Sequence, residues 1–531
     1  MNSLPSHCSV LIVGAGPSGL MMAAQLLRFG VYPVIIDSKT GLTSNSRALA
    51  VQARSLEIMR QLGVDAAVLE EGNAVKGLAI HEDTEEVAHL DLTSVGEGIS
   101  PFPYVLILEQ NKTEKLLLDY LTSNTCPVYW DTELKGVSST ERRVAVRLRR
   151  GDVDETLTCD WLIGADGASS SVRKSQGIAF TGGTYLNKFY LADINLKGQP
   201  DGGDVRVFLE DKGFTGIFPM QRNNYRFIGI LPRTLRRRES VTFEDIKPYI
   251  TYASGIPLEE ESCYWFSTYQ LHHRMAERFR NRRCFLIGDA AHIHSPAGGQ
   301  GMNTGLQDAY NLAWKLSGVL KKEYNEGILD TYAAERMPVA RALLKTTDRL
   351  FTIAATQNWL ISRIRNWLLP KILQMFWRDR NIPVKLFARI SQTGIQYRSS
   401  PLSVHHSQSG RVKAGDRLPF LRLFDEKLKE DSDLHSWCSK PGFTLLVIGF
   451  LSQRDVHLLA KWIKSAYPLD LNFYYLPPSK PNQHIFDFLE IKEDRNKALI
   501  IRPDMHIGYM NDIVDIELLD IYLKETVGWR K

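Results

Sequence analysis

Hydrophobic and polar positions at the start of the chain predict a strand, a helix and a second strand. Residues 10–13 form an apolar run rich in β-branched side chains, which is typical of a buried parallel strand. A glycine-rich turn follows at 14–19, and residues 20–29 carry apolar side chains at helical spacing. A second buried run at 34–36 ends at Asp37. Together these segments predict a β-α-β unit.

The pattern changes character in the middle of the chain. Between 181 and 266, aromatic and β-branched residues alternate with polar ones, and glycine, asparagine and proline turns separate the runs. This alternation predicts an antiparallel sheet, inserted between segments with buried runs at 162–163 and 285–287. Helical spacing then dominates from 304 to 325 and from 332 to 390.

The last third of the chain carries three further signals. The segment 359–390 is aromatic and basic, which is compatible with a membrane-surface helix or with an amphipathic connector packed on the main body. Pro370 and Pro383 interrupt its pattern and favour the connector. The polar stretch 399–410 predicts a linker, and the strand and helix signals after it predict a small separate α/β domain.

Composition sets broad limits on the class of protein. A chain of 531 residues, 44% hydrophobic and 24% charged, has a globular balance and is long enough for roughly two to four folding units. The net charge of +5 is small for this length and does not favour a nucleic-acid partner. The six cysteines contain no CxxC pair, which argues against a disulfide framework or a zinc site and favours the cytoplasm. Residues 1–9 lack signal-peptide features, and the apolar run at 443–451 is too short to span a bilayer.

The first candidate motif is the glycine-rich turn at 14–19. Gly14 permits the tight turn, Gly16 lets a pyrophosphate approach the backbone, and Gly19 lets helix and strand pack closely. The helix N-terminus adds free N–H groups and a favourable dipole, and Asp37 ends the next strand at the distance suited to an adenosine ribose. A plain surface turn is the alternative, but the register favours a dinucleotide site for FAD or NAD.

Two further motifs follow predicted strands. Residues 159–167 end in Asp166 and a glycine, a pattern that an ordinary Asx turn also explains. Residues 283–292 deliver Asp289 to a second glycine-rich loop, which opens another helix. Such a loop presents backbone N–H groups to a partner that gains negative charge, as a reduced flavin does at N1 and O2. These motifs favour FAD over NAD.

Taken together, the three motifs resemble those of the class A flavoprotein monooxygenases, the para-hydroxybenzoate hydroxylase-like family. Residues 160–173 match the family's DG block and residues 283–296 match its GD block, and the resemblance covers about 9–341 in the correct order. It implies an α/β fold in which a Rossmann-like FAD-binding domain is interleaved with a substrate domain built on an antiparallel sheet.

The resemblance implies cofactor contacts at the adenosine end of FAD. Gly14, Gly16 and Gly19 match the positions that hold the pyrophosphate. Asp37 matches the ribose ligand, where the family more often has glutamate. Arg47 matches an arginine near the pyrophosphate.

Further contacts are implied along the flavin end. Gln110 matches the glutamine that contacts the ribityl chain, Asp166 is assigned to FAD and to transient NAD(P)H binding, and Asp289 to the ribityl and pyrophosphate region. The positions that border the isoalloxazine ring are Pro296, Gly301, Met302 and Asn303. No metal site is expected. No catalytic base is chosen, because packed or solvated roles explain the candidates His272, His273, Tyr269, Arg274, Tyr225, Arg226, His292 and His294.

The tail also resembles one branch of the family. Residues 415–419 and 502–508 are similar to the thioredoxin-like C-terminal domain of the phenol hydroxylase and polyketide hydroxylase branch. Cys438 is alone there, so dithiol chemistry is not expected. The expected divisions are a FAD-binding domain at 1–75, 106–178 and 276–350, a substrate-binding sheet domain at 76–105 and 179–275, a helical connector at 351–405 and a thioredoxin-like domain at 406–531.

The implied function is that of a monooxygenase which uses NADPH or NADH and O2 to hydroxylate a phenolic or polycyclic aromatic compound, through a flavin C4a-hydroperoxide. The expected protein is a cytoplasmic monomer or homodimer without a nucleic-acid or membrane partner. Baeyer–Villiger oxidation, epoxidation, antibiotic inactivation and a non-catalytic flavoprotein are the open alternatives. A disulfide oxidoreductase is disfavoured because no close cysteine pair exists, and a halogenase because no Trp-x-Trp-x-Ile-Pro signature is found.

Overall fold

A largely parallel sheet forms around the N-terminal strand in the computed structural model, which describes residues 3–44, 48–82, 84–196, 203–210, 213–259, 262–295, 298–354, 359–377, 379, 381–467, 471–492 and 494–530. The main strand order is β17-β18-β11-β1-β2-β8, and the pairings from β18 to β8 are parallel. The hairpin of β9 and β10 extends β11 in antiparallel fashion. The strands of this sheet are β1 (His7–Val13), β2 (Val34–Ile36), β8 (Val128–Tyr129), β9 (Thr132–Ser139), β10 (Val144–Arg150), β11 (Val153–Gly164), β17 (Arg280–Asn281) and β18 (Cys284–Leu286).

Helices cover this sheet because its strands are apolar on both faces. Val10, Leu11 and Ile12 are completely buried, as the continuous apolar run predicts. Helix α1 packs against α4 and α7. The helices of this part are α1 (Pro17–Arg28), α2 (Ala53–Leu62), α3 (Asp65–Glu71), α4 (Gln110–Ser123), α5 (Ser171–Ser175) and α7 (Gly301–Leu320), and a small sheet beside them joins β3 (Ala50–Val51), β7 (Leu106–Ile107) and β4 (Asn73–Ala74).

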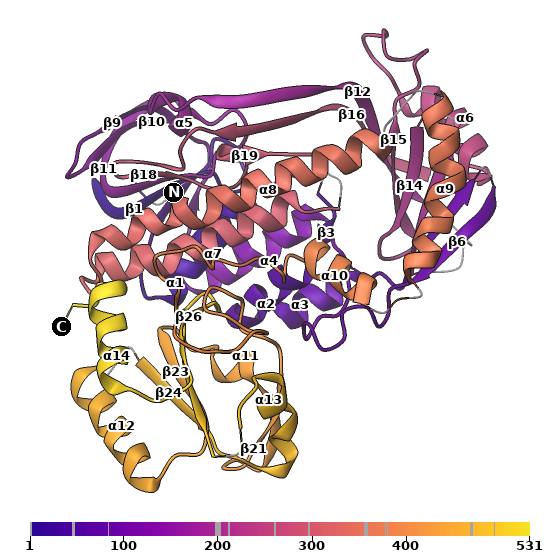
Figure 1. Cartoon of the computed structure of the whole chain (residues 1–531). Helices are drawn as coiled ribbons and strands as arrows, with labels where there is room; N and C mark the ends of the chain where they lie inside the picture. Colours follow the sequence, from indigo (N-terminus) through magenta and orange to yellow (C-terminus); the bar gives the residue numbers. More distant parts are fainter. Residues whose placement is uncertain are drawn as a thin grey trace.

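The second large sheet is mainly antiparallel, which confirms the interpretation of the middle segment. Its order is β19-β16-β12-β15-β14-β13-β5-β6, with one parallel pairing between β13 and β5. The long strands β12 and β16 reach from the first sheet into the second (Figure 1). Helix α6 (Phe243–Ser254) lies within the segment predicted as sheet. The strands are β5 (Gly77–Glu82), β6 (Glu85–Asp91), β12 (Phe180–Asn195), β13 (Asp204–Glu210), β14 (Gly213–Pro219), β15 (Asn224–Ile230), β16 (Cys263–Ala276) and β19 (His292–Ile293).

Between α7 and the C-terminal sheet, the described residues form α8 (Asp330–Ala354), α9 (Trp359–Trp377) and α10 (Asn381–Ile390). The expectation that Pro370 interrupts the helical pattern is wrong, because α9 continues through it. Helix α9 packs across one face of the second sheet, over the strands β13, β5 and β6 at the end of its order (Figure 1). No helix among the described residues is long and apolar enough to cross a membrane.

The C-terminal part is a five-stranded sheet with helices around it (Figure 1, orange to yellow). The stretch 399–410 is not a free linker, because it contributes β20 to this sheet and the buried hydroxyl of Ser407 donates to Asp512 at 2.6 Å. Cys438 is buried in the hydrophobic core of this part. Its elements are β20 (Val404–His405), β21 (Arg422–Asp425), β22 (Glu430–Asp433), α11 (Leu434–Trp437), β23 (Phe443–Gly449), α12 (Gln453–Ala466), β24 (Leu471–Leu476), α13 (Gln483–Phe488), β25 (Asn496–Ile501), β26 (Ile507–Asn511) and α14 (Ile516–Ile521).

Candidate cofactor site

The three sequence motifs meet at one edge of the first sheet. Strands β18, β11, β1 and β2 are consecutive and parallel, so their carboxyl ends lie together. Backbone hydrogen bonds join the turns that follow them: the Gly14 N–H donates to the Ile36 carbonyl at 2.8 Å, and the Ala165 N–H donates to the Val13 carbonyl at 2.8 Å. Ligands of open parallel sheets bind at this edge.

The structure gives a different role to each of the three glycines in the first turn. Gly14 has a φ of +106°, and a Cβ there would collide with the Ala165 carbonyl oxygen. A Cβ at Gly19 would collide with the Gly14 carbonyl oxygen, so this position sets the close approach of α1 to the turn. At Gly16 a Cβ would meet no described atom within 4 Å. The first and third glycines are therefore needed by the fold, whereas the second borders open space.

Asp37 is tied to the glycine-rich turn. Its buried carboxylate accepts hydrogen bonds from the Ala15 N–H at 2.7 Å and from the Lys39 N–H at 2.8 Å. Each carboxylate oxygen has a further lone pair, so these bonds leave acceptor capacity for a ribose hydroxyl. The Asp37 side chain, which is shorter than the glutamate more common in the family, thus stabilises the glycine-rich turn.

Asp166 caps the short helix α5. Its carboxylate accepts hydrogen bonds from the Ser170 hydroxyl at 2.5 Å and from the N–H groups of Ser171 and Val172 at 2.7 and 3.1 Å. Burial raises the Asp166 pKa, and these hydrogen bonds act in the opposite direction. These hydrogen bonds reach the start of α5 and are not those of an Asx turn, which the sequence left as an alternative.

Asp289 differs from the other two aspartates because no donor among the described residues reaches its carboxylate. The side chain is exposed, yet the protein around it desolvates the carboxylate and raises its pKa, while His292 acts in the opposite direction. A desolvated carboxylate without a donor from the protein fits a ligand that can donate a hydrogen bond from a hydroxyl group, such as the ribityl chain or the ribose of FAD.

The glycine-rich loop of the third motif leads into α7, a helix of 20 residues. Asn303 is completely buried: its amide donates to the carbonyls of Ala50 and Gly299 at 2.9 and 2.7 Å, and its side-chain oxygen accepts the Gln52 N–H at 2.9 Å. Its side chain thus fixes the loop, and the backbone of the first helical turn is the part available to a ligand. Free N–H groups and the helix dipole there favour negative charge.

The structure shows protein contacts for three of the remaining residues that were predicted to contact the cofactor. Gln110 begins α4, and its amide donates to Glu114 at 2.8 Å. Met302 is partly buried against the hydrophobic core, and Gly301 lies beside His294, whose Nε2 would be 3.5 Å from a Cβ there. Arg47 and Pro296 lie outside the described residues.

Ser18 connects the first and third motifs, a contact that the sequence analysis missed. A Cβ at Gly288, where φ is +57°, or at Gly305 would collide with the Ser18 hydroxyl. Two glycines, one in the GD block and one inside α7, therefore let α1 approach both elements. A glycine in a helix interior signals close packing, so Gly305 was the clue available in the sequence.

A cluster of buried charged side chains holds the turn of the third motif in place. Asp308 in α7 accepts hydrogen bonds from Arg336 Nε at 2.7 Å and from the Gly288 N–H at 3.1 Å, and its Oδ2 lies 2.7 Å from His292 Nε2. Burial acts to raise the Asp308 pKa, but Arg336 and His292 lower it below the usual value. The cluster binds the Gly288 turn to α7 and α8.

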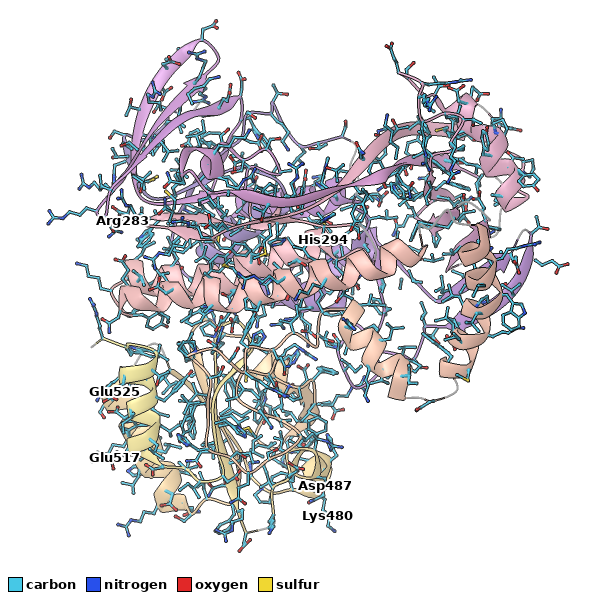
Figure 2. All side chains as sticks on the ribbon, turned by 45° about the horizontal axis from the view of Figure 1, so that its top comes forward. Arg283, His294, Lys480, Asp487, Glu517 and Glu525 are labelled. Atoms are coloured by element: carbon cyan, nitrogen blue, oxygen red, sulfur yellow. The ribbon has the colours of Figure 1, made fainter. Side chains whose placement is uncertain are left out.

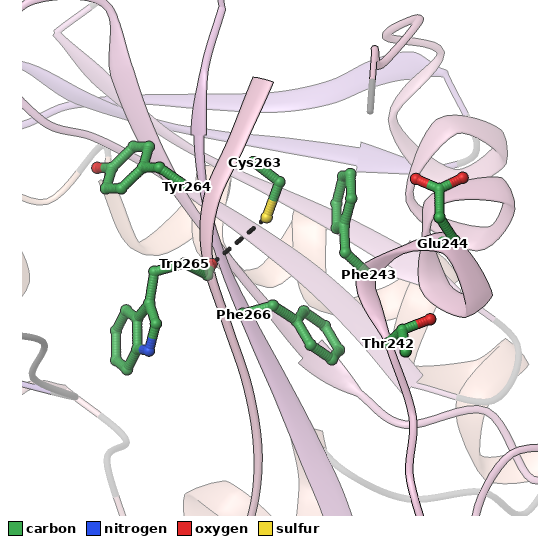
Figure 3. A pocket seen from close by; sticks show the side chains of 7 residues that line it. All are labelled: Thr242, Phe243, Glu244, Cys263, Tyr264, Trp265 and Phe266. Atoms are coloured by element: carbon green, nitrogen blue, oxygen red, sulfur yellow. Dashed lines mark hydrogen bonds between the residues drawn. The ribbon is translucent and has the colours of Figure 1, made fainter. Parts of the chain in front are cut away.

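The third motif carries the chain from the edge of the molecule to its centre. Figure 2 shows Arg283, before β18, at the outer side and His294, after β19, further inward beside the long helices. A separate hollow of about 290 Å³ lies between α6 and the start of β16, lined by Thr242, Phe243, Glu244, Cys263, Tyr264, Trp265 and Phe266 (Figure 3). It contains none of the motif residues, so it is not the predicted cofactor site.

The chain is similar to known proteins over most of its length. The family described as "FAD binding domain" (FAD_binding_3) matches residues 7–347. The chain is 35% identical over 401 residues to the 6-methylpretetramide 4-monooxygenase of Streptomyces rimosus, covering 74% of this chain and 71% of that protein. It is 34% identical over 434 residues to the pentachlorophenol 4-monooxygenase of Sphingobium chlorophenolicum, covering 79% of this chain and 78% of that protein.

Similarity to a solved structure extends over nearly the whole chain. The anhydrotetracycline hydroxylase OxyS of Streptomyces rimosus superposes with a TM-score of 0.78 at 25% identity, covering 99% of this chain and 100% of that chain. The C-terminal part of the chain is included in this coverage, so the similarity is not limited to residues 7–347.

Proposed function

The chain belongs to the FAD binding domain family of flavin-dependent monooxygenases, and from that premise we propose that it hydroxylates a phenolic or polycyclic aromatic compound with NAD(P)H and dioxygen. The predictions of a monooxygenase and of FAD as cofactor are confirmed by this membership. The substrate class is supported by relatives named for pentachlorophenol, a phenol, and for anhydrotetracycline, a polycyclic compound.

We propose that FAD lies along the carboxyl edge of the first sheet. The observation that carries this proposal is the meeting of Gly16 and Asp289 at that edge: one offers open space to a pyrophosphate, and the other is a crowded carboxylate without a donor among the described residues. Gly14, Gly19 and Asp37 shape the glycine-rich turn that contains Gly16. When bound, the flavin accepts a hydride from NAD(P)H and activates dioxygen.

The residues of the chain bind and orient in this proposal. The Asp289 carboxylate would accept a hydrogen bond from a hydroxyl of the ribityl chain, and the N–H groups at the start of α7 would stabilise negative charge on the ring. Asn303 keeps that helix start against β3 through its amide hydrogen bonds. Gln110 and Asp166 are proposed to contact the cofactor with their remaining lone pairs, and Arg47, Pro296, Gly301 and Met302 to border it.

We further propose that the large antiparallel sheet holds the substrate and that the C-terminal part is a thioredoxin-like domain. Support for the second point comes from strand order: β26-β25-β23-β24, with β24 parallel to β23 and β25 antiparallel to it. The helices α12, α13 and α14 connect or follow these strands in the order β-α-β-α-β-β-α. Cys438 is buried and its pKa is raised by burial, so a structural role is proposed for this domain.

The test is a screen of phenols and polycyclic aromatics on the FAD-loaded protein. NADPH and NADH are mixed with it in turn, and both flavin bleaching and NAD(P)H consumption are followed with and without each aromatic. The proposal expects consumption that a substrate accelerates and that is matched by one hydroxylated product per dioxygen consumed. A flavin that never bleaches would instead indicate a non-catalytic flavoprotein. A ring-expanded or epoxide product would correct the reaction type.

A further inference from the structure

Helix α9 has apolar side chains on two opposite sides, and one side is covered by the second sheet. Asn366 and Pro370 are buried on this inner side. Leu373 packs against a hydrophobic cluster of that sheet, and Trp377 Nε1 donates to the Asp91 carbonyl in β6 at 3.2 Å. The spacing of four, three and four residues places these side chains on one helical face. This face attaches α9 to the body of the protein.

The opposite face of α9 is apolar as well, and it is exposed. We call it the outer stripe; its residues are Arg363, Ile364, Trp367, Leu368, Lys371 and Met375. Ile364, Trp367 and Met375 expose 59%, 62% and 58% of their surface. From Ile364 the stripe follows the spacing of three, four, seven and eleven residues, which is one side of a helix. Large apolar side chains gathered on an exposed face mark an interaction site.

We propose that the outer stripe docks on an anionic lipid surface. The helix Trp359–Trp377 contains no aspartate or glutamate, and Arg363 and Lys371 lie exposed within the stripe. The Lys371 ammonium lies 3.9 Å from the centre of the Trp367 ring, so the positive charge and the large aromatic side chain are adjacent on the surface. Exposed tryptophan and aliphatic side chains flanked by cations are the combination that binds the interface of acidic bilayers.

A second copy of the chain is a poorer occupant of the stripe. In a two-fold contact the same patch packs against itself, so the stripe with Arg363 and Lys371 would meet a second set of the same cations, with no acidic residue from α9 among them. A lipid surface supplies the negative charge that the stripe lacks. The sequence alone favoured a connector, and the inner side of α9 has that role; the exposure of the outer side appears only in the folded chain.

The test compares vesicle binding by the FAD-loaded full chain. Sedimentation is measured with vesicles of phosphatidylcholine alone and with vesicles of equal parts phosphatidylcholine and phosphatidylglycerol. The proposal expects binding to the mixed vesicles, at least about tenfold weaker binding to the neutral ones, and release by added salt. Trp367→Ser and Lys371→Glu should each weaken binding about tenfold or more while the flavin remains bound. Tyr252→Ser is the control, because Tyr252 is 84% exposed on α6, outside the stripe.

Three results would overturn the proposal. One is wild-type protein that stays in solution with the mixed vesicles. Another is binding that survives both Trp367→Ser and Lys371→Glu. The third is a dimer in analytical ultracentrifugation that Trp367→Ser converts to a monomer, without vesicle binding, which would make the stripe an interface between copies of the chain.

Discussion

Arg502 and Glu335 join the C-terminal sheet to helix α8 through two parallel hydrogen bonds of 2.6 and 2.9 Å, and both side chains are completely buried. Lys315 from α7 donates to the same carboxylate at 2.7 Å. Burial acts to raise the Glu335 pKa, but Arg502 and Lys315 lower it below its usual value. The carboxylate therefore stays charged and holds two helices of the cofactor-binding part against the C-terminal sheet.

Replacing Arg502 by methionine should destabilise the whole chain strongly. The change removes the bidentate partner of Glu335 in a completely buried site. Removing one member of a buried ion pair costs about 3–5 kcal/mol. The unfolding midpoint in urea, followed by tryptophan fluorescence, measures this. Arg149→Met removes an exposed pair with Asp154 and serves as the control, with no expected shift. Equal midpoints for both variants would contradict the role given to Arg502.

Alanine at Gly14 and at Gly16 should have separable effects. Gly16→Ala meets open space and an ordinary backbone conformation, with φ of −80°, so the apoprotein should unfold at the wild-type temperature while FAD affinity falls. Gly14→Ala forces a Cβ into the Ala165 carbonyl oxygen at positive φ. It should therefore lower both the unfolding temperature of the apoprotein and the affinity for FAD. Thermal unfolding of the apoprotein and fluorescence titration with FAD distinguish the two. Wild-type FAD affinity in Gly16→Ala would place the pyrophosphate elsewhere.

Replacing Asp289 by alanine should weaken FAD retention by about 1–3 kcal/mol, because a buried hydroxyl of the cofactor loses its acceptor. The apoprotein should keep its stability, since no described donor loses a partner. The dissociation constant from flavin fluorescence checks this, with Asp152→Ala, at an exposed turn, as the control. Identical dissociation constants for both variants and the wild type would remove Asp289 from the site.

Protonation of the Glu57 carboxylate should lower the free energy of unfolding in acid. Its carboxylate is buried against Arg417 and Arg54, at 3.0 and 2.8 Å. Burial acts to raise its pKa, but Arg417, His435 and Arg54 together lower it from 4.5 to about 2. A lowered folded pKa adds stability above pH 4.5 that is lost as the pH falls toward 2, on the order of 3 kcal/mol. Unfolding midpoints across this range should converge for wild type and Glu57→Gln. Glu97→Gln, at an exposed residue, should run parallel to wild type.

The chemistry-bearing turns could be predicted from the sequence because each is a local arrangement. A buried β-branched run, a glycine where φ is positive and an aspartate at a strand end are neighbours along the chain, so their spacing reports the structure directly. The strand at 34–36 was predicted to the residue. The inserted antiparallel sheet followed in the same way from alternation along single strands, although helix α6 within it did not.

The tertiary structure decided which distant residues meet. Charged residues are expected in water, so nothing local distinguishes Glu335 and Arg502 as a completely buried pair 167 positions apart. Likewise, the contact of Ser18 with Gly288 and Gly305 depends on how α1 and α7 cross. The free carboxylate of Asp289 and the exposed outer side of α9 follow from the absence of a neighbour among the described residues. Absence of a neighbour is a property of the packed chain, and a single sequence does not carry it.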